Sequence, residues 1–313
     1  MLDNNQIYIH ADQVITKVSE PELKDMSKLT LFANHESNRD ESQVQCFLTL
    51  FDSSTHTVYF RQRKSSNLIL WDLFAPSDTL QRLLQYSVKA SKFDYLLWPE
   101  SWQSPPKLLV FDMDSTFIQI EVIDELAKRH GVGDSVSKVT EAAMRGELDF
   151  SASLISRVAC LKGLSQTTIA DICADLPLTE GVDRLVKKCH QSDVKVAIVS
   201  GGFTPFVEHI KKNMDLYQVK ANDLQVNSGR LTGELMGDIV DAKAKAEYVI
   251  ELAYKLKLKN TEIMTIGDGA NDLQMMRVSG FSLAYRAKPA VQAEARGRMN
   301  STHLNHLIDI FDW

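Results

Sequence analysis

The sequence predicts an α/β protein built on a parallel sheet, and three observations carry that prediction. From Lys107 onward, short apolar runs typical of buried strands alternate with segments of helical periodicity. Four consecutive helical segments follow the first of these runs with no strand between them, which is the pattern of an insertion. Before residue 100 the chain is mostly β-leaning. The expected fold class is therefore α/β, with a Rossmann-like parallel sheet core and an inserted helical cap domain, preceded by a small α+β N-terminal domain.

Composition narrows the class of protein. The 313 residues suit one large domain or two medium ones, and a hydrophobic content of 44% is ample for a packed core. The net charge of -6 argues against non-specific nucleic-acid binding. No apolar run approaches the roughly 18 residues of a membrane span, and no signal-peptide layout opens the sequence. Four cysteines fit neither a disulfide framework nor a zinc site, so we expect a cytoplasmic protein.

Residues 1–100 are expected to form the small α+β domain, with no catalytic constellation of their own. By loose analogy, this domain resembles regulatory domains that bind small molecules. Residues 101–106 are rich in Pro and Ser and are expected to be a linker. The predicted strands are 6–10, 29–33, 44–51, 57–61 and 93–98, and the predicted helix is 78–90.

Residues 107–313 are expected to form the main domain, with the helical cap at about 121–178. The predicted strands are 108–111, 194–199, 262–266 and 281–285, with a hairpin at 223–236. The predicted helices are 121–130, 134–145, 150–161 and 168–176 in the cap, then 180–190, 205–213 and 244–256.

The strand at 108–111 ends at a pair of acids, Asp112 and Asp114, followed by Ser115 and Thr116. Because side chains alternate along a strand, the two acids start on the same side and can share one ligand. Burying two unpaired acids is costly, and a bound divalent cation removes that cost. The alternative is a pair of solvated acids in a turn, which is the commoner interpretation of an isolated Asp-x-Asp.

Two further predicted strands end in polar clusters. If the three strands are parallel neighbours, the clusters converge at the sheet edge where open α/β sheets bind ligands. Asp268 would add a third carboxylate, giving a hard oxygen site suited to Mg²⁺. The loop at 267–272 also suggests calcium, but it lacks the pattern of an EF-hand. The clusters are Ser200-Gly201-Gly202 after the second strand and Asp268, Asn271 and Asp272 after the third.

These clusters suit a phosphate ester. Ser200 and the amides of Gly201 and Gly202 can donate hydrogen bonds to phosphate oxygens, although Ser-Gly-Gly is most often a plain turn. A lysine ahead of the third strand, Lys243 or Lys245, would neutralise the remaining phosphate charge. A carboxylate nucleophile that forms an aspartyl-phosphate is a known route for phosphoryl transfer.

Taken together, these motifs resemble the haloacid dehalogenase superfamily. Within it, the chain resembles the phosphoserine phosphatases, in their long bacterial form with an extra N-terminal domain. The resemblance runs from about residue 107 to residue 313, and it does not extend to the first hundred residues. The resemblance rests on residues 112–116, 200–202, Lys245 and 267–272, together with the more specific stretches 120–125, 143–150 and 287–289.

The resemblance implies a role for each matched residue. Asp112 would be the nucleophile, and Asp114 would protonate the leaving oxygen and then activate water. Mg²⁺ would be held by Asp112, the backbone carbonyl of Asp114 and Asp268. Phosphate would be bound by Ser200, Gly201 and Lys245, with Asn271 beside metal and substrate and Asp272 and Gly202 in support.

The resemblance also assigns Glu121 and Arg157, in the cap, to the amino and carboxylate groups of phosphoserine. Physical chemistry supports this assignment, because an acid pairs with an ammonium and a guanidinium can grip a carboxylate with two hydrogen bonds. The alternatives are a first-turn acid that favours the dipole of its helix and an arginine on a solvated face.

The expected function is Mg²⁺-dependent hydrolysis of O-phospho-L-serine through an aspartyl-phosphate, the last step of serine biosynthesis. One alternative is a related small-molecule phosphatase or mutase of the same superfamily. Another is a non-enzymatic phospho-acceptor switch, against which Asp114 argues because it promotes turnover. The expected partner is a small molecule, with no nucleic acid and no membrane, and a homodimer is a possible assembly. The sequence leaves open what the N-terminal domain binds.

Overall fold

The computed structural model of the chain describes residues 7–11, 14–17, 26–34, 58–65, 68–85, 93–100 and 102–313. Within these ranges the strands form one sheet, and no helix is long and apolar enough to cross a membrane. The strands are β1 (Ile7–Ala11), β2 (Val14–Lys17), β3 (Ser27–Asn34), β4 (Val58–Lys64), β5 (Leu68–Ala75), β6 (Asp94–Leu97), β7 (Leu108–Phe111), β8 (Lys195–Phe203), β9 (Gln218–Asn227), β10 (Arg230–Met236), β11 (Ile263–Gly267), β12 (Phe281–Tyr285) and β13 (Gly297–Met299).

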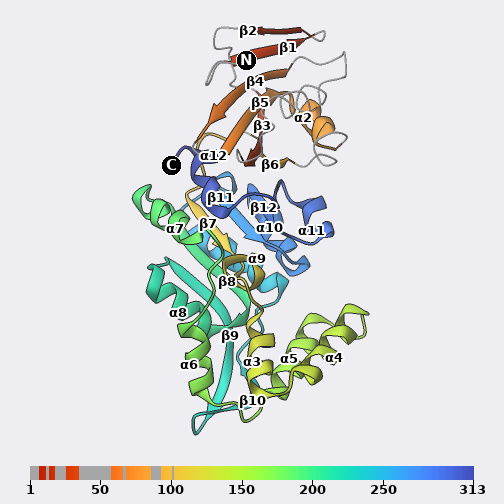
Figure 1. Cartoon of the computed structure of the whole chain (residues 1–313), viewed down its shortest axis with the longest axis vertical. Helices are drawn as coiled ribbons and strands as arrows, with labels where there is room; N and C mark the ends of the chain where they lie inside the picture. The colour runs from red at the N-terminus through yellow and green to blue at the C-terminus, as the bar shows by residue number, and fades with distance from the viewer. Residues whose placement is uncertain are drawn as a thin grey trace.

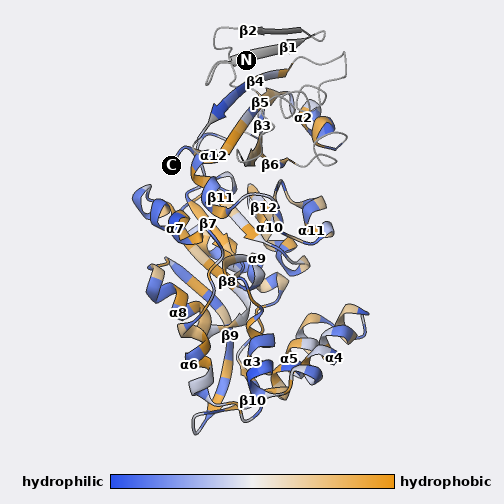
Figure 2. Cartoon of the chain, viewed as in Figure 1, coloured by the Kyte–Doolittle hydropathy of each residue, from blue (hydrophilic) through white to orange (hydrophobic). Residues whose placement is uncertain are grey.

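One half of the sheet is parallel except for its antiparallel edge strand β10, and the other half is antiparallel. Its order is β10-β9-β8-β7-β11-β12-β13-β6-β3-β5-β4-β1-β2, and neighbours from β9 to β13 run parallel. Strands β7, β11 and β12 are buried along their whole length, and Figure 2 shows β7 as strongly hydrophobic. The predicted parallel core is confirmed. From β7 the chain runs outward through β8, β9 and β10 and then crosses to β11, so β7 and β11 flank the point where the strand order reverses.

Helices cover this core and build the cap. Between β7 and α7 the described chain contains four helices, α3 to α6, as predicted. Figure 1 shows α4 and α5 beside α3, at the end of the molecule away from the N-terminal strands. The helices are α2 (Ser77–Leu83), α3 (Val122–His130), α4 (Gly133–Met144), α5 (Phe150–Cys160), α6 (Gln166–Ala174), α7 (Val182–Gln191), α8 (Thr204–Met214), α9 (Ala242–Leu256), α10 (Leu273–Val278), α11 (Pro289–Glu294) and α12 (Leu307–Phe311).

Two connections join the cap to the sheet, and they lie side by side. Ile118 and Leu178 form an antiparallel bridge, and the Thr179 amide donates to the Phe117 carbonyl at 3.0 Å. The far side of the cap rests on the β9–β10 hairpin, where Gly163 and Leu231 share a backbone hydrogen bond of 2.8 Å. The cap is therefore held at both ends.

Local sequence explains where the cap helices begin and end. The carboxylate of Asp149 accepts from the Ala152 amide at 2.8 Å, so it caps the start of α5. Gly131 ends α3 in the left-handed conformation at φ 77°, which a glycine adopts without steric cost.

The N-terminal strands are antiparallel and enclose a separate hydrophobic core of residues between Leu29 and Leu97. They join the main sheet through β6, which pairs with β13. Strands β2, β5 and β13 were not predicted. The predicted strand 44–51 and the end of the predicted helix 78–90 lie outside the described residues.

Buried charges tie the N-terminal strands together. Asp72 on β5 is fully buried and accepts hydrogen bonds from Arg61 and Arg63 at 2.8–2.9 Å. The Lys28 ammonium lies 3.5 Å from Asp72 and 3.8 Å from the ring centre of Trp98. Each charge therefore has a partner in the interior.

The same cluster reaches the C-terminal end of the chain. The Arg63 guanidinium donates to the carbonyls of Asp309 and Ile310 at the end of α12, at 2.8 and 3.2 Å. Beside it, both oxygens of Asp94 accept from backbone amides of residues 300–302 at 2.8–2.9 Å. Figure 1 shows α12 between the N-terminal strands and the parallel core.

Candidate active site

A cavity of about 750 Å³ lies between the cap and the carboxyl ends of β7, β8 and β11. Most of the predicted site residues line it, and three lie fully buried behind its wall. Because ligands of open α/β sheets bind at this edge, the cavity is the candidate active site. The lining residues are Asp112, Asp114, Glu121, Arg157, Gly201, Gly202, Asp268 and Asn271, and the buried ones are Ser200, Lys245 and Asp272.

Lys245 holds two of the acids. Its ammonium donates to Asp112 at 2.7 Å and to Asp272 at 2.8 Å, and all three side chains are buried. Although burial opposes the charge, the two carboxylates raise the pKa of Lys245 above its usual range. Lys243 lies at the cavity rim, where its side chain is largely exposed and 3.6 Å from Glu247. Of the two candidate lysines, Lys245 is the one beside the acids.

The carboxylates in and behind the cavity wall outnumber the cationic side chains there, so the site favours a bound positive charge. Burial and the neighbouring Asp272 raise the pKa of Asp112 to about 7, in spite of Lys245. Burial, Asp272 and Glu121 likewise raise the pKa of Asp268 to about 6. One carboxylate oxygen from each of Asp112, Asp268 and Asp272 lies within 4.8 Å of the others. Three hard oxygen donors at this spacing fit a divalent cation such as Mg²⁺.

Asp272 is less free than the other two acids of this cluster. One of its oxygens accepts from Lys245, and the other accepts from the Gly269 amide at 3.1 Å. Asp268 has one hydrogen bond from Thr116, at 3.3 Å. Both oxygens of Asp272 are thus already engaged by groups of the protein. The ligand expected from Asp114 is its backbone oxygen rather than its carboxylate.

Asp114 is held at the entrance to the cap. It lies in a tight turn, Met113–Phe117, and its Oδ1 accepts from the Val122 amide at 2.9 Å. Burial and the nearby charges of Glu121 and Asp112 raise the pKa of Asp114 well above its usual value. A carboxyl group whose pKa is raised in this way holds its proton more tightly, which suits it to act as a general acid.

The Ser-Gly-Gly segment lies within β8 rather than after it, which corrects the expected strand end. The strand continues to Phe203, with an irregular register between Val199 and Phe203. A Cβ atom on Gly202 would lie 2.7 Å from Oδ2 of Asp114, so the acid needs a glycine at this position. The Ser200 hydroxyl accepts from the Gly202 amide at 2.8 Å and lies 3.5 Å from Asp114.

Sequence reasoning missed Asn222, which fixes this segment from behind. The Asn222 amide nitrogen donates to the carbonyls of Gly201 and Gly202 at 2.9 and 3.2 Å. Its oxygen accepts from the Val240 amide at 2.8 Å, close to the start of α9 and Lys245. No local motif marks Asn222, because its partners lie 18 to 21 positions away.

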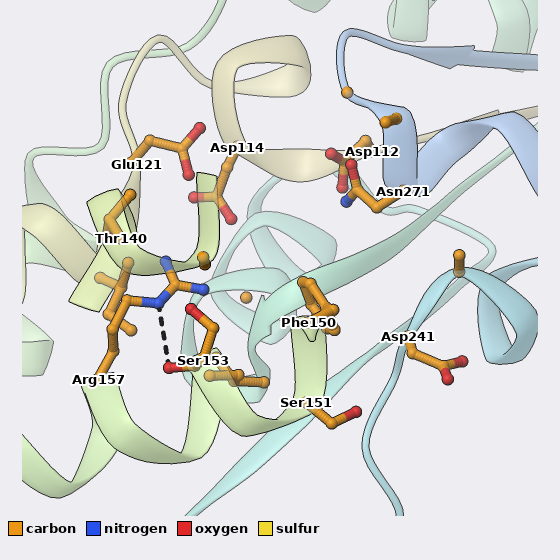
Figure 3. Close-up of a pocket in the computed structure, with 18 of the residues that line it drawn as sticks. Asp112, Asp114, Glu121, Thr140, Phe150, Ser151, Ser153, Arg157, Asp241 and Asn271 are labelled. Carbon is orange, nitrogen blue, oxygen red and sulfur yellow. Dashed lines mark hydrogen bonds between the residues drawn. The ribbon is translucent and has the colours of Figure 1, made fainter. Parts of the chain in front are cut away.

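The cap brings Glu121 and Arg157 to the opposite wall. Figure 3 shows the Arg157 guanidinium directed toward the carboxylates of Asp114 and Glu121. Glu121 is the residue before α3, yet its side chain makes no capping hydrogen bond to that helix. It accepts instead from the Ser115 hydroxyl at 2.7 Å. A helix-capping role therefore does not explain Glu121, and an acid and a guanidinium face the cavity together.

Comparisons with known proteins agree with this geometry. The haloacid dehalogenase-like hydrolase family model matches residues 106–280. A phosphoserine phosphatase of Haemophilus influenzae is 44% identical over 291 residues, covering 89% of this chain and 91% of that protein. The chain thus belongs to the haloacid dehalogenase-like hydrolases, and among them to the phosphoserine phosphatase family.

Solved structures extend the likeness to the fold. The crystal structure of a probable phosphoserine phosphatase from Vibrio cholerae has a TM-score of 0.76 and 33% identity, covering 94% of this chain and 89% of that one. A phospho-aspartyl intermediate analogue of phosphoserine phosphatase has a TM-score of 0.62 and 34% identity, covering 66% of this chain and all of the other. The first likeness includes the N-terminal strands, and the second is confined to about two thirds of the chain.

Proposed function

We propose that this site hydrolyses O-phospho-L-serine to serine and phosphate through a phosphoryl group carried on Asp112. The proposal rests mainly on one observation, which is that two walls with different chemical groups face each other across one cavity. One wall holds the Asp112–Lys245 ion pair, and the other holds Glu121 and Arg157. The relative solved as a phospho-aspartyl intermediate analogue supports the covalent route.

In the first step, an oxygen of Asp112 forms a bond to phosphorus while the bond from phosphorus to the serine oxygen breaks. Lys245 binds Oδ1 of Asp112, which leaves Oδ2 available for attack. Asp114 gives its proton to the departing serine oxygen, as its raised pKa allows. Serine leaves as the neutral alcohol.

In the second step, Asp114 is the base. It takes a proton from water while the water oxygen bonds to phosphorus and the bond between Asp112 and phosphorus breaks. Phosphate is released, and both acids return to their starting forms. One residue serves both steps because each step leaves Asp114 in the protonation state that the next requires.

The remaining residues bind the phosphate and the metal ion. Mg²⁺, held by Asp112, Asp268 and the Asp114 carbonyl, would neutralise phosphate charge and orient the ester for in-line displacement. Lys245 offers the cation that balances the remaining charge, and Asn222 supports the two glycines. The proposed phosphate-binding residues are Ser200, Gly201, Lys245 and Asn271, with Gly202 and Asp272 in support.

The substrate's amino acid part would lie against the cap. The Glu121 carboxylate suits its ammonium group, and the Arg157 guanidinium suits its carboxylate. These two groups would distinguish phosphoserine from phosphate esters that lack one charge or both.

We also propose the division of the chain into residues 1–100, a linker at 101–106 and a phosphatase domain at 107–313. The separate hydrophobic core of the N-terminal strands supports it. The regulatory role of that domain, the cytoplasmic location, the homodimer and the place in serine biosynthesis stay predictions. The free thiols of Cys160, Cys173 and Cys189 agree with a reducing compartment.

Phosphate release from a panel of phosphoserine, phosphothreonine, phosphoethanolamine and phosphoglycerate tests the function. We expect the highest kcat/KM with phosphoserine, loss of activity on chelation and its return with Mg²⁺. Asp112→Asn should abolish turnover without unfolding the protein. A clear preference for another ester would refute the substrate, and turnover by Asp112→Asn would refute the covalent route.

A further inference from the structure

The backbone at Ser115 has an uncommon conformation. Its φ of 54° lies in the left-handed region, which few residues other than glycine adopt. It follows the acid Asp114 directly, and its amide donates to the Ile120 carbonyl at 3.3 Å. Such a conformation persists only where surrounding contacts hold it. Residues strained in this way cluster at functional sites.

The left-handed turn aims the Ser115 hydroxyl at Glu121. The hydroxyl donates to Oε1 of Glu121 at 2.7 Å, the length of a hydrogen bond to a charged acceptor. Among the described residues this is the one hydrogen bond that the Glu121 side chain makes. A carboxylate has two oxygens and about four acceptor positions, so Oε2 stays available to a ligand.

A second contact closes the same loop. The Val122 amide donates to Oδ1 of Asp114 at 2.9 Å, so residues 114 and 115 are both tied to residues 121 and 122. The hydrogen bond from Val122 fixes the proposed catalytic acid Asp114, and the hydrogen bond from Ser115 fixes the carboxylate of Glu121. Glu121 itself is exposed, so without Ser115 its long side chain would rotate freely.

We propose that Ser115 is a positioning residue that orients Glu121 to receive the substrate ammonium. This inference rests on the proposed hydrolysis of phosphoserine and adds a determinant of specificity to it. Ser115 acts through Glu121 and makes no contact with the reacting phosphorus. The loss of its hydroxyl should therefore weaken the binding of the amino acid part and leave phosphoryl transfer intact.

The test compares Ser115→Ala and Ser115→Gly on phosphoserine and on phenyl phosphate, which has no ammonium. Alanine keeps the backbone strain, whereas glycine removes it. Both variants should raise KM for phosphoserine about 10-fold, the effect of a lost hydrogen bond to a charged group, with kcat and phenyl phosphate turnover nearly unchanged. Combined with Glu121→Gln, Ser115→Ala should add little further loss.

Ser228 provides a matched control. It also has a positive φ, of 50°, and its hydroxyl donates to the Asn227 side chain at 3.0 Å, in the β9–β10 turn away from the cavity. Ser228→Ala and Ser228→Gly should leave both substrates unaffected. Equal losses on both substrates in the Ser115 variants, no loss, or full additivity with Glu121→Gln would overturn the positioning role. A wild-type protein that did not prefer phosphoserine would refute the proposed function, and the role of Ser115 with it.

Discussion

At the scale of single residues, Lys245 links two parts of the site through one buried ammonium. Asp112 and Asp272 come from different strand ends, and the lysine lies between them at 2.7 and 2.8 Å. Removing the ammonium would leave two like charges buried together, which is the costliest way to break an ion pair. The lysine is therefore expected to contribute to stability as well as to the proposed binding of phosphate.

We expect Lys245→Met to lower the free energy of unfolding by about 3–5 kcal/mol at pH 7. Urea unfolding monitored by circular dichroism measures this. Lys243→Met, an exposed change two positions away, should stay within about 0.5 kcal/mol of the wild type. If the two variants were equally stable, the buried ion pair would not stabilise the fold.

Asp114 is expected to serve both chemical steps. Asp114→Asn should slow formation and hydrolysis of the aspartyl-phosphate, each by about 10²- to 10⁴-fold, because one proton carrier is lost from both. Rapid-quench kinetics with radiolabelled phosphoserine separates the two rates. A variant that forms the intermediate at the normal rate would show that Asp114 is only the base.

At the scale of elements, the proposed mechanism assigns specificity to the cap and chemistry to the sheet. Helix α5 holds Arg157, and the connection into α3 holds Glu121, whereas the other proposed catalytic and phosphate-binding groups come from the sheet side of the cavity. A substitution on the cap should thus change which ester is accepted more than how fast a phosphoryl group moves.

Arg157→Lys and Glu121→Gln should each lower kcat/KM for phosphoserine by about 10- to 100-fold, since each removes a charge-assisted contact to the substrate. Phenyl phosphate, which lacks both groups, should lose little. The informative quantity is the ratio of the two substrates on one variant. A ratio equal to that of the wild type would assign the two residues to the structure of the cap instead.

Elements whose signal is local could be predicted, and those held by distant residues could not. The apolar runs of β7 and β11 stop where the polar site residues begin, so the sequence is enough to locate these strand ends. In β5, Asp72 interrupts the apolar pattern, and its charge is balanced by Lys28, Arg61 and Arg63 on other strands. Asn222 went unnoticed for the same reason.

At the scale of the whole molecule, the N-terminal strands and the phosphatase core share one sheet. The join is the short antiparallel pair β6–β13, reinforced by Asp94 and Arg63. The Trp98 ring packs against Phe281 and Phe311, at 5.5 and 5.3 Å between ring centres. The two parts are thus expected to stabilise each other.

A chain that begins near Ser104 should keep turnover while folded, because the described site residues all follow that position. It should nevertheless unfold at a lower temperature than the full chain, since β13 keeps β12 but loses its other neighbour, β6, and Phe281 and Phe311 lose Trp98. Differential scanning calorimetry and phosphate release check both parts. A folded truncation without activity would mean that the N-terminal strands complete the site.

Acid should weaken the N-terminal strands through Asp72. Burial opposes its ionisation, but Lys28 and Arg63 hold the pKa of Asp72 well below 3.8. The unfolded state therefore binds its proton first, so this stabilisation is present above pH 4 and is lost as the pH falls further. Asp72→Asn should be less stable at pH 7 yet lose less between pH 5 and 3.

The control for this comparison is Asp78→Asn, because Asp78 is largely exposed and its ion pair with Arg82 lies at the surface. Its unfolding free energy should follow that of the wild type across the same pH range. Parallel pH profiles for all three proteins would mean that Asp72 contributes nothing to acid lability.

The β6–β13 join also has a consequence for biosynthesis. Asp94 leaves the ribosome 208 residues before its partner Thr302, and Arg63 leaves 249 residues before Asp312. At translation rates of about 5–20 residues per second, the outer edge of β6 waits roughly 10–40 s for β13. During that interval the nascent chain carries an open strand edge of the kind that other chains can pair with. Chaperone demand should therefore begin once β6 has emerged and end when β13 (Gly297–Met299) emerges and pairs with it.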